Sequence, residues 1–423
     1  MIDLKLLKER YEEIKQNIAD RHMDVDLDDV LSLQQKRNEL IREAETLRYE
    51  RNEQAKQMKQ RLNPDERSKL IESGKQLKIR IADIERELAD IEQQYTENAS
   101  RIPNFAHPDA PVGREDTDNR EISRWGDIPS FSFTPKDHME LASELDLIDF
   151  DAGVKVTGTK FYFLKNEAVF LELGLQRYAL DILGSKGFVP MVTPDLAKQS
   201  VTAGIGFNPR GSESNIYTLE EEDLCLVGTA EITLGGYHAN EIIPAENLPV
   251  KFAGISHCFR REAGAAGQYS KGLYRVHQFS KVEMFVITLP DESEEMHQEL
   301  LALEEEIFQG LEIPYRVVDT CTGDLGAPAY RKFDLEAWMP GRGDAGDWGE
   351  ITSTSNCTDY QARRLKVRTK IDGSTVHVHM LNGTALAVSR ALIALMENHQ
   401  RFDGSIMIPQ KLVPYVGFDE IRR

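Results

Sequence analysis

Apolar residues recur at intervals of seven in two stretches of the first hundred residues. The first stretch carries them at Leu33, Leu40 and Leu47. The second is stricter, because gaps of four and three residues alternate along it; its apolar positions are Leu70, Leu77, Ile81, Ile84, Leu88, Ile91 and Tyr95. This spacing is an a/d seam, which is typical of a coiled coil.

A helix-breaking turn separates the two stretches. The residues Asn63, Pro64 and Asp65 stop the first helix and form a good start signal for the second. Two long helices joined by so short a turn must fold back on each other as an antiparallel pair. About 30 residues in each helix give an arm roughly 45 Å long, because an α-helix rises about 1.5 Å per residue.

The pattern changes near residue 101, where a stretch rich in Pro, Asp and Gly reads as a linker. Beyond it, short Val/Ile/Phe runs at 249–259 and 274–288 predict strands, and helical segments are expected around 165–186, 291–310 and 383–400. The fold class is therefore α+β, with an antiparallel sheet flanked by helices. The expected domains are residues 1–100 for the helical arm, 101–120 for the linker and 121–423 for the second domain.

Charge is unevenly distributed along the chain, whose formal net charge is −20. Around the turn between the two helices, eight basic residues face only three acids; they are Lys56, Lys59, Arg61, Arg67, Lys69, Lys75, Lys78 and Arg80. A basic hairpin end can follow a phosphate backbone while the acidic remainder limits non-specific binding. The alternative is a dimerisation coiled coil with a solvated surface, because charged runs on helices usually face water.

Several classes of protein are disfavoured by composition. No run of 18 apolar residues occurs, so no membrane span is expected. The N-terminus resembles neither a signal nor a transit peptide, which favours a cytoplasmic location. The four cysteines lie more than 30 residues apart and form no CxxC pair, so neither a disulfide framework nor zinc is expected.

The densest polar segment reads as a strand, a small-residue loop and a returning strand. In the returning strand, Arg275, His277 and Phe279 alternate to one face, and Lys281 and Glu283 continue it. Paired arginines, a stackable ring and a carboxylate suit a nucleotide bound beside an amine-bearing substrate. A salt-bridged sheet surface would also explain the charges, although not the Gly/Ala loop at 263–267. GxxxxGK[ST] is not present, so a P-loop site is unsupported, and a Rossmann site is not expected either.

These segments resemble the signature motifs of class II aminoacyl-tRNA synthetases, in the form found in seryl-tRNA synthetases. Motif 2 is matched by 259–264 (FRREAG), 275–279 (RVHQF) and 281–283 (KVE), and motif 3 by 381–390 (LNGTALAVSR) leading into 395–398 (LMEN). Motif 1 is matched by 187–194 (GFVPMVTP), and two further seryl segments by 228–231 (GTAE) and 350–357 (EITSTSNC). The resemblance spans nearly the whole chain, arm included.

The resemblance implies that ATP and serine form seryl-adenylate, and that the seryl group then passes to the terminal ribose of tRNA. The residues implied to bind ATP are Arg260, Arg261, Glu262, Arg275, Val276, His277, Phe279, Glu350, Ile351, Thr352, Ser353 and Arg390. Those implied to bind serine are Thr229, Ala230, Glu231, Arg260, Glu283, Asn382 and Thr384. Arg260, Glu283 and Arg390 are the implied catalytic residues, and Glu350 and Ser353 the implied Mg²⁺ ligands.

The resemblance also implies individual roles within the ATP site. Arg260 would hold the α-phosphate and the serine carboxylate, and Arg390 the γ-phosphate of a bent ATP. Phe279 would stack on adenine, with Arg275 on its other face or near the phosphates. Two departures from the family's pattern blur the local geometry: Arg261 stands where many relatives have serine, and the segment at 350 reads EITS instead of EISS.

The same resemblance reinterprets the hairpin as a tRNA-binding arm that reaches the long variable arm of tRNA(Ser), with tRNA(Sec) as a further partner. The implied contacts are Lys56, Lys59, Arg61, Lys75 and Lys78, and the implied assembly is a homodimer through motif 1. Two alternatives remain: a paralogue that loads an amino acid on a carrier protein, and an inert regulatory or scaffolding protein. The first would lack the hairpin, and the second would lose Arg260, Glu283 or Arg390.

Overall fold

The computed structural model describes residues 1–207, 215–262 and 269–423. The chain divides into two compact units, Met1–Pro103 and Asn104–Arg423, and each is described by itself. Within the described ranges, no helix is long and apolar enough to cross a membrane.

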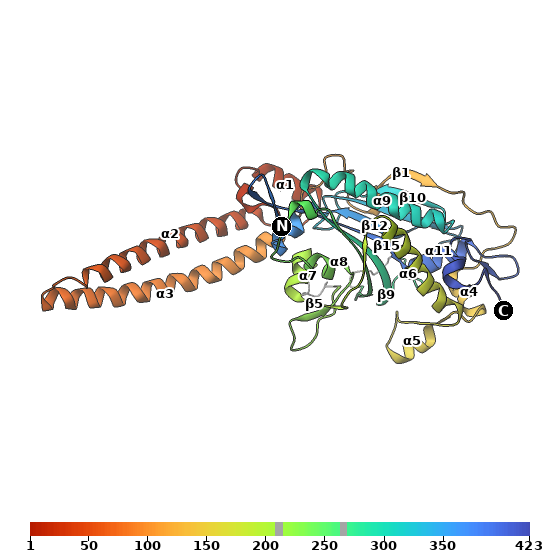
Figure 1. Cartoon of the computed structure of the whole chain (residues 1–423), viewed down its shortest axis with the longest axis horizontal. Helices are drawn as coiled ribbons and strands as arrows, with labels where there is room; N and C mark the ends of the chain where they lie inside the picture. The colour runs from red at the N-terminus through yellow and green to blue at the C-terminus, as the bar shows by residue number, and fades with distance from the viewer. Residues whose placement is uncertain (208–214, 263–268) are drawn as a thin grey trace. The chain divides into compact units, whose positions relative to one another are not determined.

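Two long helices dominate the first unit (Figure 1). They are α2 (Leu27–Gln57) and α3 (Pro64–Ser100), preceded by a short 3-10 turn (Leu4–Leu6) and α1 (Tyr11–Asp20). The start of α3 is set by a capping box, in which the Asn63 side chain accepts from the Glu66 N–H at 2.8 Å while the Glu66 carboxylate accepts from the Asn63 N–H. The predicted restart at residues 63–65 is thus confirmed, whereas the first helix already ends at Gln57.

The predicted heptad positions form the seam between α2 and α3. Leu33, Leu40, Ile81, Ile84, Ile91 and Tyr95 are buried, whereas Leu47, Leu70, Leu77 and Leu88, most of them nearer the turn, are only half-buried. Ion pairs cross the seam between Lys36 and Glu87, Arg48 and Glu85, and Arg80 and Glu43. The expected antiparallel two-helix arm is confirmed.

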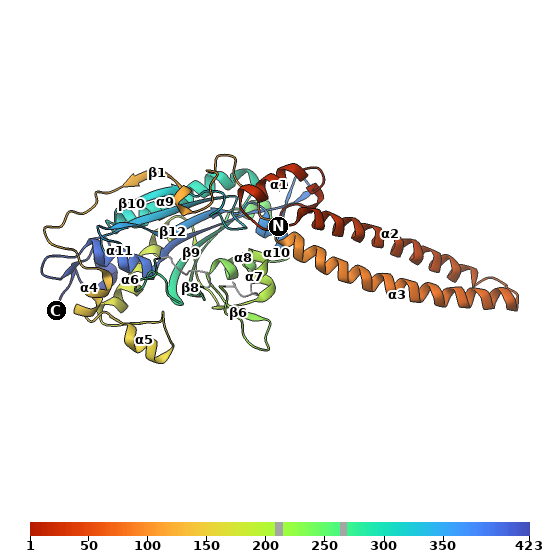
Figure 2. The ribbon, with the colours of Figure 1, turned by 180° about the vertical axis from the view of Figure 1, so that it is seen from behind.

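An eight-stranded sheet forms the centre of the second unit (Figures 1 and 2). Its strands, in spatial order, are β1 (Arg120–Trp125), β10 (Tyr315–Asp319), β11 (Arg331–Met339), β12 (Asp347–Asn356), β15 (His379–Ala387), β9 (Gln278–Thr288), β8 (Val250–Phe259) and β4 (Val189–Val192). Every neighbouring pair is antiparallel except β4 and β8. The expected α+β class is confirmed.

Helices cover both faces of the sheet, because the central strands carry apolar side chains on each face. Met284 and Val286 of β9 pack in the core that includes α6 (Glu167–Ser185), α9 (Ser293–Gly310) and α11 (Val388–Asn398). Phe285 and Ile287 pack in a second core with α7 (Gln199–Ile205), α8 (Glu231–Gly236) and α10 (Tyr360–Leu365). Lys281 and Glu283 share the parity of Phe285, so they lie on this second face.

The remaining elements are short. The helices are α4 (His138–Glu144), α5 (Phe150–Val156) and α12 (Val413–Val416), and the 3-10 turns are Asp116–Asp118, Ala245–Asn247 and Pro290–Glu292. The minor sheets pair β2 (Ile148–Asp149) with β3 (Phe163–Leu164), β5 (Leu196–Lys198) with β6 (Leu224–Leu226), β16 (Ile406–Met407) with β17 (Glu420–Ile421), and β13 (Arg368–Ile371) with β14 (Ser374–His377) and β7 (Ile242–Ile243).

Two predicted elements begin or end elsewhere. The returning strand starts at Gln278 and not at 274, because Tyr274 N–H closes a turn on the Lys271 carbonyl and the chain pairs with β8 only from Gln278 onward. The segment expected as a helix from 383 stays in β15 up to Ala387, where it pairs with β9, and is helical only from Val388. Tertiary pairing overrode the local helical pattern in this second case.

Candidate active site

A recess on the second face of the sheet lies among β8, β9, β12, β15 and the start of α11. Its lining residues are Arg260, Glu262, Tyr274, Arg275, Val276, Phe279, Lys281, Glu350, Ile351, Thr352, Thr384, Ala387, Ser389 and Arg390. Nine of them were predicted as ATP ligands, and Thr384 as a serine ligand. Segments more than 100 residues apart in sequence thus meet in one recess.

Arg260 follows the end of β8 and is held by two contacts. Its Nε donates to the Gly228 carbonyl at 3.2 Å, and its guanidinium lies 5.3 Å from the centre of the Phe279 ring. The ring and the guanidinium therefore share one wall of the recess. A guanidinium stacked in this way keeps its outer N–H groups free of the ring face for a carboxylate or phosphate.

Glu262 and Arg275 form an ion pair across the mouth of the loop that separates β8 from β9. Arg275 Nη1 lies 3.0 Å from Glu262 Oε2, and Arg275 Nε donates to the Tyr269 carbonyl at 3.2 Å. The loop at 263–268, with the Gly/Ala residues of motif 2, lies outside the described residues. Both partners line the recess, and each can exchange its ion pair for a ligand.

Arg390 and Glu350 form a second ion pair in the recess. Arg390 Nη1 lies 3.1 Å from Glu350 Oε1 and donates to the Glu350 carbonyl at 2.9 Å, and its guanidinium lies 4.8 Å from the Tyr274 ring centre. The surrounding protein disfavours charge on Glu350, but Arg390, Lys332 and Arg260 outweigh it and hold the pKa of Glu350 below its ordinary value. The residue is therefore an anion at neutral pH.

A β-bulge places Glu350 and Ser353 on the same face of β12. Residues three apart in a regular strand point to opposite faces, but the register shifts between Glu350 and Thr352, where they pair with Glu336 and Leu335. Ser353 consequently pairs with Asp334, which lies on the same face and whose Oδ1 is buried with no hydrogen-bond partner among the described residues. Three oxygen-bearing side chains thus line one short stretch of the sheet.

The serine side of the predicted site is anionic and buried. Glu283 is 1% exposed and forms an ion pair with Lys281, whose Nζ also donates to Thr384 Oγ1 at 3.2 Å. Glu283 and Thr384 face each other directly in the pairing of β9 with β15. The ammonium and the hydroxyl therefore lie on the floor of the recess, and the buried Glu283 carboxylate pairs with that ammonium.

Glu231, at the start of α8, is held by two amide groups. Its Oε1 accepts from Gln361 Nε2 at 2.7 Å and from Asn382 Nδ2 at 2.9 Å. The pKa of Glu231 is raised to about 7, because burial and the nearby Glu283 raise it more than the Gln361 hydrogen bond lowers it. Thr229 orients the helix start, because its Oγ1 accepts from the Glu231 N–H at 3.1 Å.

Comparison with known proteins agrees with both halves of the chain. Residues 1–106 match the model of the seryl-tRNA synthetase N-terminal domain, and 217–399 that of the tRNA synthetase class II core domain (G, H, P, S and T). The serine–tRNA ligase of Treponema denticola is 62% identical over 422 residues, which cover 100% of each chain. The chain belongs to the seryl-tRNA synthetase family. The serine–tRNA ligase of Rubrobacter xylanophilus is 56% identical, and the match covers 100% of this chain and 99% of that relative. These full-length relatives assign serine–tRNA ligase activity to the chain.

Solved members of the seryl-tRNA synthetase family share this fold. The Pyrococcus horikoshii seryl-tRNA synthetase, solved in complex with ATP, superposes with a TM-score of 0.90 at 40% identity, and the match covers 100% of this chain and 99% of that one. The cytoplasmic serine–tRNA ligase of Naegleria fowleri, solved with AMP, gives a TM-score of 0.83 at 32% identity over 97% and 95% of the two chains.

Some residues predicted from the family motifs do not turn their side chains into the recess. The Thr352 hydroxyl donates to Glu304 of α9 at 2.8 Å, and Ile351 packs in the core on that side. His277 donates from Nδ1 to the Arg260 carbonyl at 2.6 Å, so it supports the strand end behind Arg260. Ala230 is fully buried beneath the Glu231 helix. Arg261 uses its backbone N–H to bind the Asn215 carbonyl.

The structure adds Tyr274, Lys281, Asp334 and Gln361 to the predicted set. Lys281 and Tyr274 could both have been found from motif 2, because Lys281 lies in its last segment and Tyr274 directly precedes Arg275. Gln361 and Asp334 carry no local signal, because their contacts with Glu231 and Ser353 join segments far apart in sequence. Only the fold brings them to the site.

The predicted RNA contacts of the first unit lie on and near the turn between α2 and α3. Lys56, Lys59, Arg61, Lys75 and Lys78 are all exposed. Lys56 and Lys75 pair with Glu53 and Glu72 one turn away on their own helices, at 2.6 and 3.6 Å. Such exposed pairs are weak and give way readily to phosphates.

Proposed function

We propose that this chain joins L-serine to ATP as seryl-adenylate, with release of pyrophosphate, and then moves the seryl group to the 3′-terminal ribose of tRNA(Ser). The observation that carries the proposal is one recess with Arg260, Arg390 and Phe279 on one side and Lys281 and Thr384 on the other, where the buried Glu283 pairs with Lys281 and faces Thr384. The first side suits a nucleotide triphosphate, and the second an ammonium group. The related P. horikoshii enzyme, solved with ATP, supports the assignment of ATP.

In the first step, a carboxylate oxygen of serine attacks the α-phosphorus of ATP as the bond to pyrophosphate breaks. Charge accumulates on the phosphoryl oxygens, so fixed cations lower the barrier. Arg260 would bridge the α-phosphate and the serine carboxylate, and Phe279 beside it would stack on adenine. Arg390 and Arg275 would neutralise the outer phosphates, each by exchanging its present carboxylate partner for phosphate.

The face of β12 fits a magnesium ion. Glu350 and Ser353 offer a carboxylate and a hydroxyl on one side of the bulge, and Asp334, whose Oδ2 pairs with Lys332 at 3.4 Å, lies opposite Ser353. Oxygen donors of this kind, completed by phosphate oxygens and water, are what Mg²⁺ prefers. A bound Mg²⁺ would neutralise phosphate charge, with Glu350 and Ser353 as the residues that hold it.

Serine would be read by its ammonium and hydroxyl groups. Glu283 and Glu231 are the anionic acceptors for the ammonium and hydroxyl, and Thr229, Thr384 and Asn382 supply further polar atoms. A site lined with such groups rejects an analogue that lacks the hydroxyl, because its own buried polar atoms are then left unpaired.

The test is ATP–pyrophosphate exchange across the amino acids. Exchange is expected with serine and at most a small fraction of that rate with threonine, alanine or glycine. Equal exchange with alanine or glycine would contradict the serine pocket and favour the carrier-protein alternative.

Serine recognition should weaken in acid. The pKa of Glu231 is raised to about 7, so its carboxylate loses its charge, and its attraction for an ammonium, as pH falls through 7. Between pH 8 and pH 6 the kcat/KM for serine should therefore fall by roughly tenfold, while the kcat/KM for ATP changes less. Glu231→Gln should bind serine weakly and without this pH dependence. A wild-type profile for serine that is flat over this range would show that Glu231 does not bind the substrate in its charged form.

We also propose which residues contact tRNA and where in the cell the reaction takes place. The arm residues Lys56, Lys59, Arg61, Lys75 and Lys78 would follow the RNA backbone. A tRNA(Sec) is included as a second substrate, since M. kandleri SerRS was solved with a tRNASec, although at 18% identity that protein shares only the fold. Because tRNA is charged where proteins are made, we place the activity in the cytoplasm.

We also propose a two-fold homodimer through motif 1. The edge strand β4 and the neighbouring helix α6 expose apolar side chains, with Val192 85%, Leu173 59% and Phe170 56% exposed. Apolar groups beside an unpaired strand edge usually mark an interface. Light scattering should report a dimer, and a stable 48.0 kDa monomer at micromolar concentration would contradict it.

A further inference from the structure

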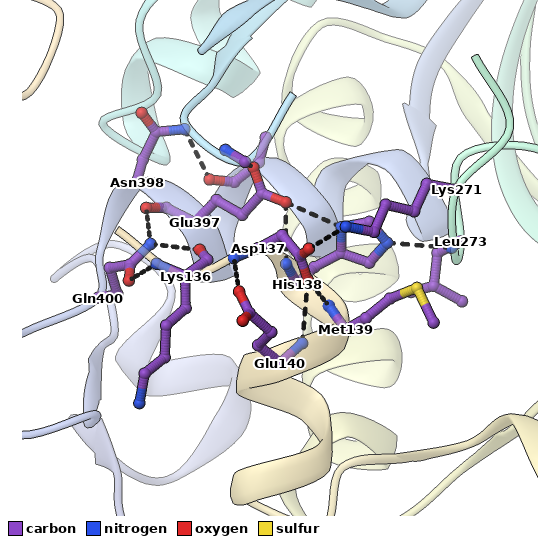
Figure 3. A network of polar contacts seen from close by, with 12 residues as sticks. Lys136, Asp137, His138, Met139, Glu140, Lys271, Leu273, Glu397, Asn398 and Gln400 are labelled. Atoms are coloured by element: carbon purple, nitrogen blue, oxygen red, sulfur yellow. Dashed lines mark hydrogen bonds and ion pairs between the residues drawn. The ribbon is translucent and has the colours of Figure 1, made fainter. Parts of the chain in front are cut away.

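A buried histidine at the start of α4 lies against the motif 3 helix. The His138 side chain is 0% exposed, and its Nδ1 lies 2.8 Å from Glu397 Oε1 in α11 (Figure 3). The same carboxylate oxygen also accepts from the His138 backbone N–H at 2.9 Å. The two elements are therefore joined at one residue by two hydrogen bonds.

The other ring nitrogen of His138 binds the chain that leads into motif 2. Its Nε2 accepts from the Leu273 backbone N–H at 3.2 Å (Figure 3). A backbone N–H can only donate, so Nε2 carries no proton, and Nδ1 must be the donor to Glu397. Both hydrogen bonds thus require the neutral imidazole in one tautomer.

The backbone next to Leu273 is shaped for this contact. Gly272 has a φ of +55°, and a Cβ built on it would lie 2.1 Å from His138 Nε2. Only glycine lets the ring approach the chain here. Lys271 forms an ion pair with Asp137, so three consecutive residues of the segment are placed against the start of α4.

Glu397 also links His138 to the part of the recess proposed to bind ATP, around Tyr274, Arg275 and Arg390. Its Oε2 accepts from the Gly341 N–H at 2.8 Å, and the guanidinium of the next residue, Arg342, lies 4.8 Å from the Tyr274 ring centre. Arg390 lies on the same helix, two turns before Glu397, and contacts the same ring. Tyr274 and Arg275 directly follow the segment that His138 holds.

We propose that His138 is a positioning residue for the ATP half of the active site, an inference that rests on the proposed function. It holds residues 271–273 and, through Glu397, the motif 3 helix, so that Tyr274, Arg275 and Arg390 meet ATP in one geometry. The serine half is built from Glu231, Glu283 and Asn382, and within the described ranges none of the three forms a hydrogen bond or ion pair with His138, Glu397 or residues 271–273. Loss of His138 therefore acts on ATP and spares serine.

Two near-isosteric substitutions separate the two hydrogen bonds. In His138→Gln the amide oxygen can occupy the position of Nε2 and accept from Leu273, and in His138→Asn the amide nitrogen can occupy that of Nδ1 and donate to Glu397. In ATP–pyrophosphate exchange, the Asn variant should raise the KM for ATP by about tenfold, because the Leu273 N–H is left unpaired. The Gln variant should stay within about threefold, and both should keep the KM for serine within about twofold.

KM is the deciding quantity, because a variant that is only partly folded loses kcat but keeps the KM of its folded fraction. His399→Asn is the matched control: His399 follows the same helix two residues after Glu397, but its Nε2 donates to the Leu311 carbonyl at 2.9 Å and it has no hydrogen bond to residues 271–273 within the described ranges. It should leave both KM values unchanged.

An unchanged KM for ATP in His138→Asn would overturn the inference, and so would an equal rise in both KM values. A Gln variant as impaired as Asn would overturn the role of the Leu273 contact. If the unaltered chain shows no serine-dependent exchange, the proposed function fails, and the inference fails with it.

Discussion

Arg260→Ala and Arg390→Ala should each lower serine-dependent ATP–pyrophosphate exchange by about 100- to 1,000-fold, the usual cost of removing one donor that stabilises developing charge. Both guanidinium groups are already oriented: Arg260 by the Gly228 carbonyl and the Phe279 ring, and Arg390 by Glu350 and the Tyr274 ring. Such pre-orientation is what makes a donor effective in the transition state. Arg260→Lys should recover little activity, because an ammonium cannot make the planar two-pronged contact.

Arg124→Ala serves as the control for loss of an arginine. Arg124 lies on the edge strand β1 and pairs with Glu121 at 2.9 Å, outside the recess. Its exchange rate should match that of the unaltered chain. Near-normal exchange in either active-site variant, with an unchanged circular dichroism spectrum, would show that the phosphate ligands lie elsewhere.

Deletion of the hairpin, about residues 30–97, should leave serine activation nearly intact while charging of tRNA(Ser) collapses. Every proposed ATP and serine ligand lies at Thr229 or beyond, in the second compact unit. The cut is feasible, because Asp29 Oδ2 accepts from Asn98 Nδ2 at 2.7 Å, so the two new ends lie side by side. Full-rate charging by the deleted chain would make the arm an assembly device.

Charge reversal at Lys56, Lys59, Lys75 and Lys78 is a milder version of the deletion. It should weaken tRNA binding and reduce its salt dependence by up to about one unit of slope for each lost phosphate contact. Pyrophosphate exchange by the same variant is the internal control and should not change. Binding with an unaltered salt slope would show that these side chains face solvent only.

The arm was largely predictable, because its rules are local. A heptad seam, a proline turn and a capping residue can each be recognised within a few residues of sequence, and the second helix begins where these signals place it, although the first already ends at Gln57. The seam also predicted which side chains are buried, although its end near the turn is only half-buried. A hairpin tip has few neighbours to cover it.

The sequence predicted which residues gather at the active site better than it predicted where their side chains point. Motif residues such as Arg260 and Arg390 do meet in one recess, yet strand alternation misleads at β12, where the bulge puts Glu350 and Ser353 on one face and turns Thr352 toward Glu304. The start of motif 3 is a strand because β9 and β12 pair with it. These outcomes depend on non-local pairing, which no short window of sequence contains.

The same limit explains the residues that pattern reasoning missed. Gln361 is hydrogen-bonded to Glu231, 130 residues away in sequence, and Glu397 is hydrogen-bonded to His138, 259 residues away. Gln361 belongs to no motif, and Glu397 lies in the motif 3 segment but was given no role there. Each became visible only as the hydrogen-bond partner of a buried polar group, which must be satisfied somewhere in the fold.

The most direct test of the account is attachment of radiolabelled serine by the purified, full-length chain to a tRNA(Ser) transcript and, in parallel, to a carrier protein. We expect label to accumulate on the tRNA in an ATP-dependent, alkali-labile ester, and not on the carrier protein, with tRNA(Sec) charged in the same assay. Label on the carrier protein alone, or serine-dependent pyrophosphate exchange without any charged tRNA, would contradict it.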